Sequence, residues 1–251
     1  MDPQFNATQY ILGITNDEYM DYYKKIKDQK KTIYCLFNDS KDDKKDTDDK
    51  KKVGLLFNGK ATKEKYLEND YIINIKENFD IIVGGIDLIE LQINQKQGIT
   101  KRLEKYIDIR NLRHYYEYIL IDCPPTYSFF FISAYHVTDT YVIPVKPDSV
   151  STLGLSLLHR AIGSIEDKTK EATSIGVIYT LIDNRNKIHK PIMKEIEESI
   201  GKANVFKEKV YLFTDITKGI IDRRFMLDIE NNDIDKNIKK IVEKFIGRVK
   251  K

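Results

Sequence analysis

The chain has 251 residues, of which 41% are hydrophobic and 32% are charged, and this composition suits one α/β domain with a heavily solvated surface. Its 42 basic and 39 acidic side chains leave a formal net charge of +3, which permits contact with a polyanion but does not argue for one. No stretch approaches the ~20 consecutive apolar residues of a transmembrane helix, and residues 1–10 have neither the basic start nor the apolar middle of a signal peptide.

The first third of the chain shows no regular pattern, and we expect it to be irregular. Residues 39–52 form a mixed-charge run without an apolar residue, which predicts a mobile loop. Short apolar runs after this loop, each bounded by turn residues or by helical spacing, predict strands. These runs are Ile81–Val83, Tyr118–Ile121, Tyr141–Val145 and Ile175–Ile182.

Two segments near the carboxyl end have the spacing of amphipathic helices. Isoleucine recurs every four residues from Ile188 to Ile200, with Gly201 just past the end. A second apolar stripe runs through residues 234–249, and Asp233 is placed to cap that helix at its amino end. Apolar strands separated by helices predict a mostly parallel sheet that is covered by helices on both faces. We therefore expect an α/β fold that forms a single domain over residues 1–251.

The candidate chemistry begins at Asp122, which follows the expected strand Tyr118–Ile121 directly. Ligands of open α/β sheets gather at the carboxyl ends of the strands, and in P-loop ATPases a carboxylate at this place orients the Mg²⁺ shell. Pro124 and Pro125 stiffen the exit loop, which then can serve as a switch that senses the γ-phosphate. The alternative is a strand that simply ends in a loop, and the residues ILID alone favour that alternative.

The longer run over residues 118–158 carries more information. It reads YILIDCPPTYSFFFISAYHVTDTYVIPVKPDSVSTLGLSLL, with a DCPP strand end, an apolar helix, a strand that ends in IPV, and Gly154-Leu155. This order resembles the Walker B block of the ParA/MinD group of deviant-Walker P-loop ATPases. The acidic residue that the family has before its Gly-Leu pair is missing here, since Leu153 stands in that place. The resemblance implies a P-loop NTPase fold of the SIMIBI-like type, with ATP and Mg²⁺ as cofactors.

Residues 2–9, DPQFNATQ, resemble the second switch of the same family, usually written D-x-D-P-Q-x-N-A-T. The resemblance implies that Asp2 polarises the attacking water and that Asp2 and Asp122 are the catalytic residues, with Asp122 holding Mg²⁺ through water. A carboxylate is suited to positioning a nucleophile for phosphoryl transfer. Taken alone, DPQ-x-N is equally an ordinary turn.

The run YTLIDNR fits the family's V-T-x-x-D-x-R strand end, which lies near the nucleotide base. The resemblance therefore assigns Thr180 and Asp183 to cofactor binding, together with Pro124 in the switch loop. The family's later Pro-Arg motif is not visible, because Phe213-Thr214 stands about there. Its adenine contacts are therefore not carried over.

The family's phosphate loop is the main departure, since no G-x-x-x-x-G-K-[ST] occurs in the 251 residues. The resemblance places that loop before Asp2, so we expect the chain to be N-terminally truncated and to lack the first strand, the phosphate loop and the first helix. This unit has on the order of 30 residues or more. Without it the chain is expected to be a poor ATPase. Either Met1 is a start within a longer gene or the chain is a decayed homologue, and we favour a truncated or remnant sequence over a new role.

The resemblance also implies partners. Family members act in plasmid or chromosome partition as ATP-dependent dimers that bind DNA non-specifically and meet a ParB-like centromere-binding protein. Residues 218–251 contain ten basic and six acidic side chains, and we assign DNA contact to Lys218, Arg223 and Arg224. The competing interpretation of the remaining charges is a solvated helix face. Two cysteines, Cys35 and Cys123, cannot form a disulfide framework and fit a nucleoid-associated protein of the reducing cytoplasm.

Two other functions remain open. One is a MinD-like membrane switch, for which the basic amphipathic tail at residues 238–251 would be the anchor. Its broad, regular apolar stripe suits packing on a sheet better, so a membrane partner is disfavoured. The other is a nucleotide-free interaction module that regulates a full-length homologue.

Overall fold

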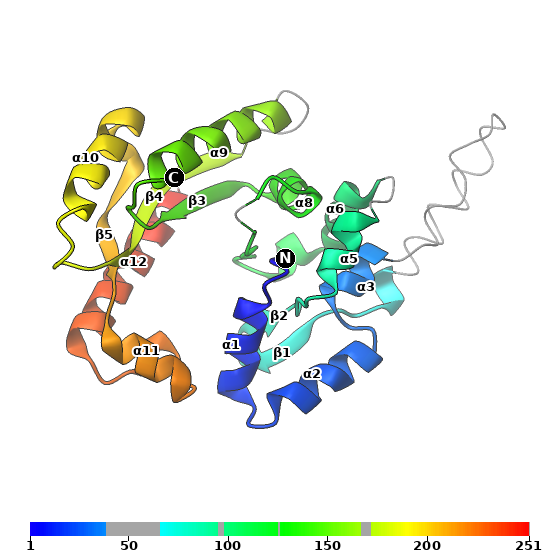
Figure 1. The fold of residues 1–251 in the computed structure, drawn as a ribbon. Coiled ribbons are helices and arrows are strands. Elements are labelled where there is room, and N and C mark those ends of the chain that lie inside the picture. Colours follow the sequence, from blue (N-terminus) through cyan, green and yellow to red (C-terminus); the bar gives the residue numbers. More distant parts are fainter. Residues whose placement is uncertain (39–65, 95–97, 125, 167–171, 251) are drawn as a thin grey trace. The chain divides into compact units, whose positions relative to one another are not determined.

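A computed structural model describes residues 1–38, 66–94, 98–124, 126–166 and 172–250. The chain divides into two units, Met1–Val137 and Thr138–Lys251 (Figure 1). Each unit has its own sheet and its own buried apolar cluster. The mixed-charge loop expected at residues 39–52 lies outside the described residues, and the single domain over residues 1–251 stays a prediction.

The first unit is mainly helical and contains one antiparallel strand pair, β1–β2. Its elements are α1 (Asn6–Thr15), α2 (Tyr19–Asp28), α3 (Ile33–Asn38), β1 (Ile73–Lys76), β2 (Phe79–Ile81), α5 (Leu88–Ile93), the 3₁₀ helix η2 (Ile99–Lys101), α6 (Arg102–Ile109), α7 (Leu112–Tyr115) and α8 (Phe129–Val137). The expectation of an irregular first third is wrong, because residues 6–15, 19–28 and 33–38 are helical. These helices are short, and each buries only a few side chains, so their apolar pattern is weak.

Two apolar clusters hold the first unit together. In the first, Leu12 of α1 and Ile26 of α2 bury against Ile73 and Val83 of the β1–β2 region. In the second, the ring of Phe37 packs edge-on against two rings of α8, and the buried Arg102 side chain donates to the Phe37 carbonyl. The expected strand at Ile81–Val83 is confirmed in part, since β2 ends at Ile81 and Val83 forms a single parallel bridge with Thr32.

The strand expected at Tyr118–Ile121 is absent from the described structure. One main-chain hydrogen bond joins its end to another segment, from Met1 N to the Asp122 carbonyl at 2.8 Å. The side chain of Leu120 is 79% exposed. A strand needs a ladder of paired N–H and C=O groups on a neighbour, and an apolar run without such a neighbour stays irregular. The prediction of a strand at Tyr118–Ile121 was therefore wrong. Asp122 follows an irregular segment instead.

The second unit contains the parallel sheet, with β4 between β3 and β5. Its elements are β3 (Thr140–Val145), α9 (Ser151–Glu166), β4 (Thr173–Ile182), α10 (His189–Ile200), the 3₁₀ helix η3 (Lys202–Asn204), β5 (Val205–Tyr211), α11 (Thr214–Ile221), the 3₁₀ helix η4 (Met226–Asp228) and α12 (Asn232–Val249). The strands predicted at residues 141–145 and 175–182 and the helices predicted at 188–200 and 234–249 are confirmed. Neither β5 nor α11 was predicted.

Helices cover both faces of this sheet, as the apolar strands predict. On one face, Leu155 of α9 and Ile196 of α10 pack with Val177 of β4. The neighbouring Gly176 points to the opposite face, where it meets the guanidinium of Arg248 in α12. The α/β fold with a parallel sheet is therefore confirmed for this unit.

The amino-terminal cap of α12 differs from the prediction. The cap is Asn231, whose side-chain oxygen accepts hydrogen bonds from the N–H groups of Asp233 at 3.0 Å and Ile234 at 3.3 Å. Asp233 lies inside the first turn, because the helix begins at Asn232. An asparagine and an aspartate are both good caps, so their order along the chain could not decide between them.

Arg248 ties α12 to the sheet through the backbone. Its guanidinium donates to the carbonyl oxygens of Ile175 at 2.6 Å and Val205 at 3.1 Å, and it lies 4.0 Å above the ring of Phe206. The acceptors belong to neighbouring strands, so the arginine holds the starts of β4 and β5 together. Arg248 is therefore a structural residue, although it contributed to the basic excess counted at residues 218–251.

The close approach of Gly176 gives a test of this packing. The residue has φ +114°, and an added Cβ would meet the Asn204 carbonyl oxygen and lie 2.5 Å from the guanidinium of Arg248. Gly176→Ala is therefore expected to lower the free energy of unfolding by about 1–3 kcal/mol. Gly163→Ala is the matched control, because its Cβ meets nothing within 4 Å and a helix gains up to about 1 kcal/mol from alanine. Urea unfolding of the two variants should shift in opposite directions, and equal shifts would contradict the packing.

Candidate functional site

The first unit brings the two expected catalytic aspartates together. The Met1 nitrogen donates to the backbone carbonyl of Asp122, and the negative charges of Asp2 and Asp122 both act on that nitrogen. Burial lowers the pKa of the Met1 amine below its usual value. Burial also raises the pKa of the neighbouring Cys123 thiol to about 11. Asp2 and Asp122 therefore both lie near the Met1 amine, beside the Cys123 thiol.

A tight turn fixes Asp2 at the start of α1. The Asp2 carboxylate accepts a hydrogen bond from the Gln4 N–H at 2.9 Å, and its carbonyl accepts one from the Phe5 N–H at 3.2 Å. Phe5 has φ +66°, and α1 begins at the next residue. The residues DPQF are thus a turn that starts a helix. This turn places Asp2 near Asp122, and the role of Asp2 as a switch residue stays a prediction.

Thr8 and Gly84 complete this region, and sequence reasoning assigned no role to either. Thr8 is 5% exposed, and its hydroxyl accepts a hydrogen bond from the Gly84 N–H at 2.9 Å. A Cβ on Gly84 would lie 3.9 Å from the Asp2 carbonyl oxygen. The threonine that ends the D-P-Q-x-N-A-T pattern therefore anchors α1 to the loop after β2. The motif letter itself was the signal that could have identified it.

The residues around Asp2 and Asp122 are compatible with a magnesium–nucleotide complex. Mg²⁺ in nucleotide sites is held by one or two carboxylates together with substrate phosphates and waters, rather than by a full protein cage. Asp122 is exposed and Asp2 is half-buried, so both can accept such a contact. The described residues contain no cluster of three or more acidic, histidine or cysteine ligands. Pro124 is buried, which fits a stiff loop after Asp122, and Pro125 lies outside the described residues.

The expected base-side residues lie at the carboxyl end of β4 in the second unit. The guanidinium of Arg185 binds the Asp183 carboxylate with two hydrogen bonds of 3.0 Å each. This pairing holds the pKa of Asp183 below its usual value. Thr180 is half-buried, and Leu181 between them has φ +54°. A leucine in the left-handed region costs about 1–2 kcal/mol, and such strain gathers at functional loops.

The three basic residues assigned to DNA lie at the end of α11. All three side chains are exposed. Arg223 has φ +56°, and its N–H and that of Arg224 donate to the carbonyls of Ile220 and Gly219. These bonds end the helix, with Lys218 in its last turn and Arg223 and Arg224 just beyond it. The pair belongs to the α11 terminus, outside the periodic helix α12.

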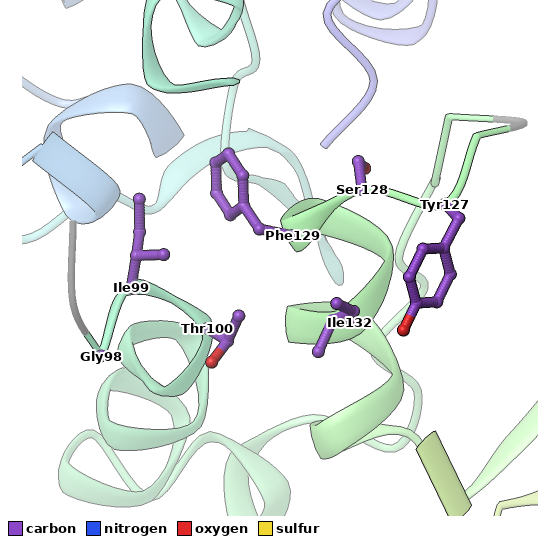
Figure 2. A pocket seen from close by; sticks show the side chains of 7 residues that line it. All are labelled: Gly98, Ile99, Thr100, Tyr127, Ser128, Phe129 and Ile132. Carbon is purple, nitrogen blue, oxygen red and sulfur yellow. The ribbon is translucent and has the colours of Figure 1, made fainter. Parts of the chain in front are cut away.

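A cavity of about 340 Å³ lies between η2 and the start of α8 (Figure 2). Buried Ile99 and Phe129 form its apolar walls, and Tyr127 stands at its side. None of the residues assigned from the sequence lines it. Some of its lining residues, from Tyr127 onward, come soon after the Asp122–Pro124 loop in the sequence, but neither Asp2 nor Asp122 lines the cavity.

Comparison with known proteins decides the family. Residues 1–175, well over half of the chain, match the model of the family described as "AAA domain" (AAA_31). The chain belongs to this family of ParA-type P-loop ATPases. It is 28% identical over 136 residues to the sporulation initiation inhibitor protein Soj of Bacillus subtilis, covering 54% of this chain and 51% of Soj. It is 27% identical over 135 residues to the chromosome partitioning protein ParA of Caulobacter vibrioides, covering 53% of this chain and 48% of that protein.

The chain thus spans about half the length of these curated relatives. A plasmid partition protein of Borrelia burgdorferi, solved with AMPPNP, has a similar fold. The TM-score is 0.67 at 19% identity, and the match covers 99% of this chain and 84% of that one. Within the part of the chain that the structure describes, no helix has both the length and the apolar character needed to cross a bilayer.

Thr8 of this ParA-type ATPase offers a local test of the aspartate region. Thr8→Val removes the acceptor of a buried hydrogen bond and is expected to lower the free energy of unfolding by about 1–3 kcal/mol. Hydrogen exchange at the Gly84 amide should become faster in the same variant. Thr8→Ser keeps the hydroxyl and should preserve the protection of that amide. Equal exchange rates of the Gly84 amide in the valine and serine variants would contradict the hydrogen bond between Thr8 and Gly84.

Proposed function

We propose that the chain is a homologue of the ParA-like partition ATPases, which act in plasmid or chromosome segregation as ATP-driven dimer switches that bind DNA non-specifically. The observation that carries this proposal is the meeting of Asp2 and Asp122 in a chain of the ParA-type family. The names of Soj and ParA, and the AMPPNP bound to the partition protein from Borrelia burgdorferi, support it.

The two aspartates divide the work in this proposal. When bound, ATP·Mg²⁺ supplies the transferable phosphoryl group and neutralises the charge that develops on it. Asp122 would hold the metal through a water molecule, and Asp2 would orient the attacking water. Pro124 stiffens the loop that follows Asp122, and Thr180 and Asp183 contribute to the base side of the site.

The phosphate cradle is the element that this set lacks. The 251 residues contain no G-x-x-x-x-G-K-[ST], so they offer neither the amide cradle at a helix amino terminus nor the lysine that binds phosphates. We propose that these residues represent the family fold without its first strand, phosphate loop and first helix. The aspartate pair then keeps its geometry while most of the affinity for ATP is missing.

Calorimetry of the chain with ATP·Mg²⁺ is therefore expected to show binding weaker than micromolar. Joining the strand, phosphate loop and helix of a ParA-type homologue to the amino end should produce a slow ATPase, because the loop adds the missing phosphate contacts. Micromolar binding by the 251 residues alone would contradict the proposed role of the missing loop.

The joined protein also tests the two aspartates. Asp2→Ala and Asp122→Ala should each lower its turnover at least about a hundredfold, because each removes a group that acts in the reaction. Asp21→Ala is the matched control, since Asp21 is an exposed carboxylate on α2 that pairs with the exposed Lys24 in the same helix. Unchanged turnover in either of the first two variants would show that the roles are misassigned.

The end of α11 is the proposed DNA contact. Lys218, Arg223 and Arg224 are exposed and lie within seven consecutive residues at the end of α11. Helix α12 packs against β5 and β4, which favours the sheet-packing interpretation of its apolar stripe over a membrane anchor. A second copy of the chain and a ParB-like centromere-binding protein are the proposed protein partners, in the cytoplasm and on the nucleoid.

The double variant Arg223→Ala/Arg224→Ala is expected to weaken plasmid DNA binding in gel shifts. Two lost phosphate contacts should lower the slope of log affinity against log salt by about two. Lys190→Ala/Lys194→Ala on α10 removes the same charge from another exposed surface of the unit and serves as the control. Equal DNA affinities of the double arginine variant and the parent at matched salt would contradict a DNA contact at the end of α11.

A further inference from the structure

The loop after β4 is followed by a buried histidine that the proposed function does not use. His189 is the first residue of α10 and is 4% exposed. Its Nε2 atom lies 3.1 Å from the side-chain nitrogen of Asn186. Its Nδ1 atom is buried and has no hydrogen-bond partner among the described residues. A buried ring with one satisfied nitrogen has a defined protonation state, which the surrounding contacts determine.

Asn186 determines that state. Its side-chain oxygen accepts a hydrogen bond from the Ile188 N–H at 3.0 Å, so its side-chain nitrogen is the group that faces His189. An amide nitrogen only donates, and Nε2 must therefore be the acceptor. The ring hydrogen then lies on Nδ1, and the imidazole is neutral. A protonated ring would carry hydrogens on both nitrogens and would face the Asn186 amide donor to donor.

The same asparagine connects the helix to the expected base-side residues. The Asn186 N–H donates to the Asp183 carbonyl at 3.0 Å, and the Asp183 carboxylate binds the N–H and the guanidinium of Arg185. Leu181, just before Asp183, is held at φ +54°. A strained loop of this kind persists only while its surroundings hold it. The contacts run from His189 through Asn186 to Asp183.

We infer that neutral His189 is a positioning residue for the Asp183–Arg185 loop and acts through the side chain of Asn186. Protonation of His189 breaks this link and loosens the loop. The loop is therefore ordered at neutral and alkaline pH and released on acidification. The consequence for nucleotide binding rests on the proposed function, whereas the positioning itself does not.

Other charges near the ring do not replace this contact. Asp183 attracts an imidazolium, and Arg185, bound to that carboxylate, opposes the attraction. The helix α10 packs against α9 and η3. The described charged or titratable side chains on α9 and η3 and in the loop include His159, Arg160, Lys187 and Lys202, and α10 itself carries Lys190, Lys194, Glu195, Glu197 and Glu198. Neither attraction nor repulsion by these groups removes the donor–donor contact that protonation creates.

Nitrogen-15 NMR of the full chain without nucleotide tests the inference. At pH 8 the His189 ring is expected to carry its hydrogen on Nδ1 and none on Nε2. On acidification, exchange at the Arg185 and Asn186 amides should become about five- to tenfold faster, with the same midpoint as the His189 titration. A hydrogen on Nε2 at pH 8 overturns the inference. Exchange rates of the Arg185 and Asn186 amides that do not change as His189 is protonated overturn it as well.

Two variants separate positioning from a merely structural role. In His189→Gln the glutamine carbonyl accepts from Asn186 but does not titrate, so protection of the two amides should be independent of pH. In Asn186→Asp a carboxylate accepts a hydrogen bond from the protonated ring. Acidification should therefore slow exchange at the amides of residues 185 and 186, which is the opposite of its effect on the parent. Retention of the parent's acid dependence in His189→Gln overturns the inference. Because no nucleotide is present, these outcomes are independent of whether the chain belongs to an ATPase.

Discussion

The hydrogen bonding of backbone N–H and C=O groups is the constraint on which both units depend. In the second unit the ladders between β3, β4 and β5 satisfy these groups, and the order of the strands fixes where each one ends. The loop that carries Asp183 therefore lies at the carboxyl edge of the central strand. In the first unit the run at residues 118–121 has no such ladder, and a single bond from Met1 to Asp122 takes its place. The candidate catalytic region is thus held by turns and by Thr8 rather than by a sheet.

This contrast explains which parts of the fold could be predicted. The strands at residues 141–145 and 175–182 are apolar throughout and lie between helices of clear period, so pattern and structure agree. The helices at residues 6–28 are short and bury few side chains, and their signal is lost among polar residues. β5 has the sequence VFKEKVY, in which the apolar pair Val205-Phe206 is followed by three charged residues, and these hide the alternation of a strand. A run such as 118–121 cannot reveal from its own residues whether a neighbouring strand is present.

The candidate site was predictable where a motif supplied its residues. Asp2 and Asp122 are 120 positions apart, and only the resemblance to a family could suggest that they meet. The roles of Thr8, Gly84 and His189 come from contacts between distant segments or from the direction of one amide group. Spacing along the chain carries no information on such contacts. Asn231 shows the same limit at short range, since two neighbouring polar residues competed for one cap.

The arginine in α12 has a consequence for how relatives of this chain can diverge. Arg248 donates to the carbonyl oxygens of Ile175, Ala203 and Val205, which every amino acid supplies. The side chains at those positions are therefore free to drift without disturbing the bonds. The guanidinium does constrain the side chains at Phe206, on whose ring it stacks, and at Gly176, where it fills the space of a Cβ. Homologues that keep the arginine should keep glycine and an aromatic ring at these positions, while the other side chains of the strands vary around them.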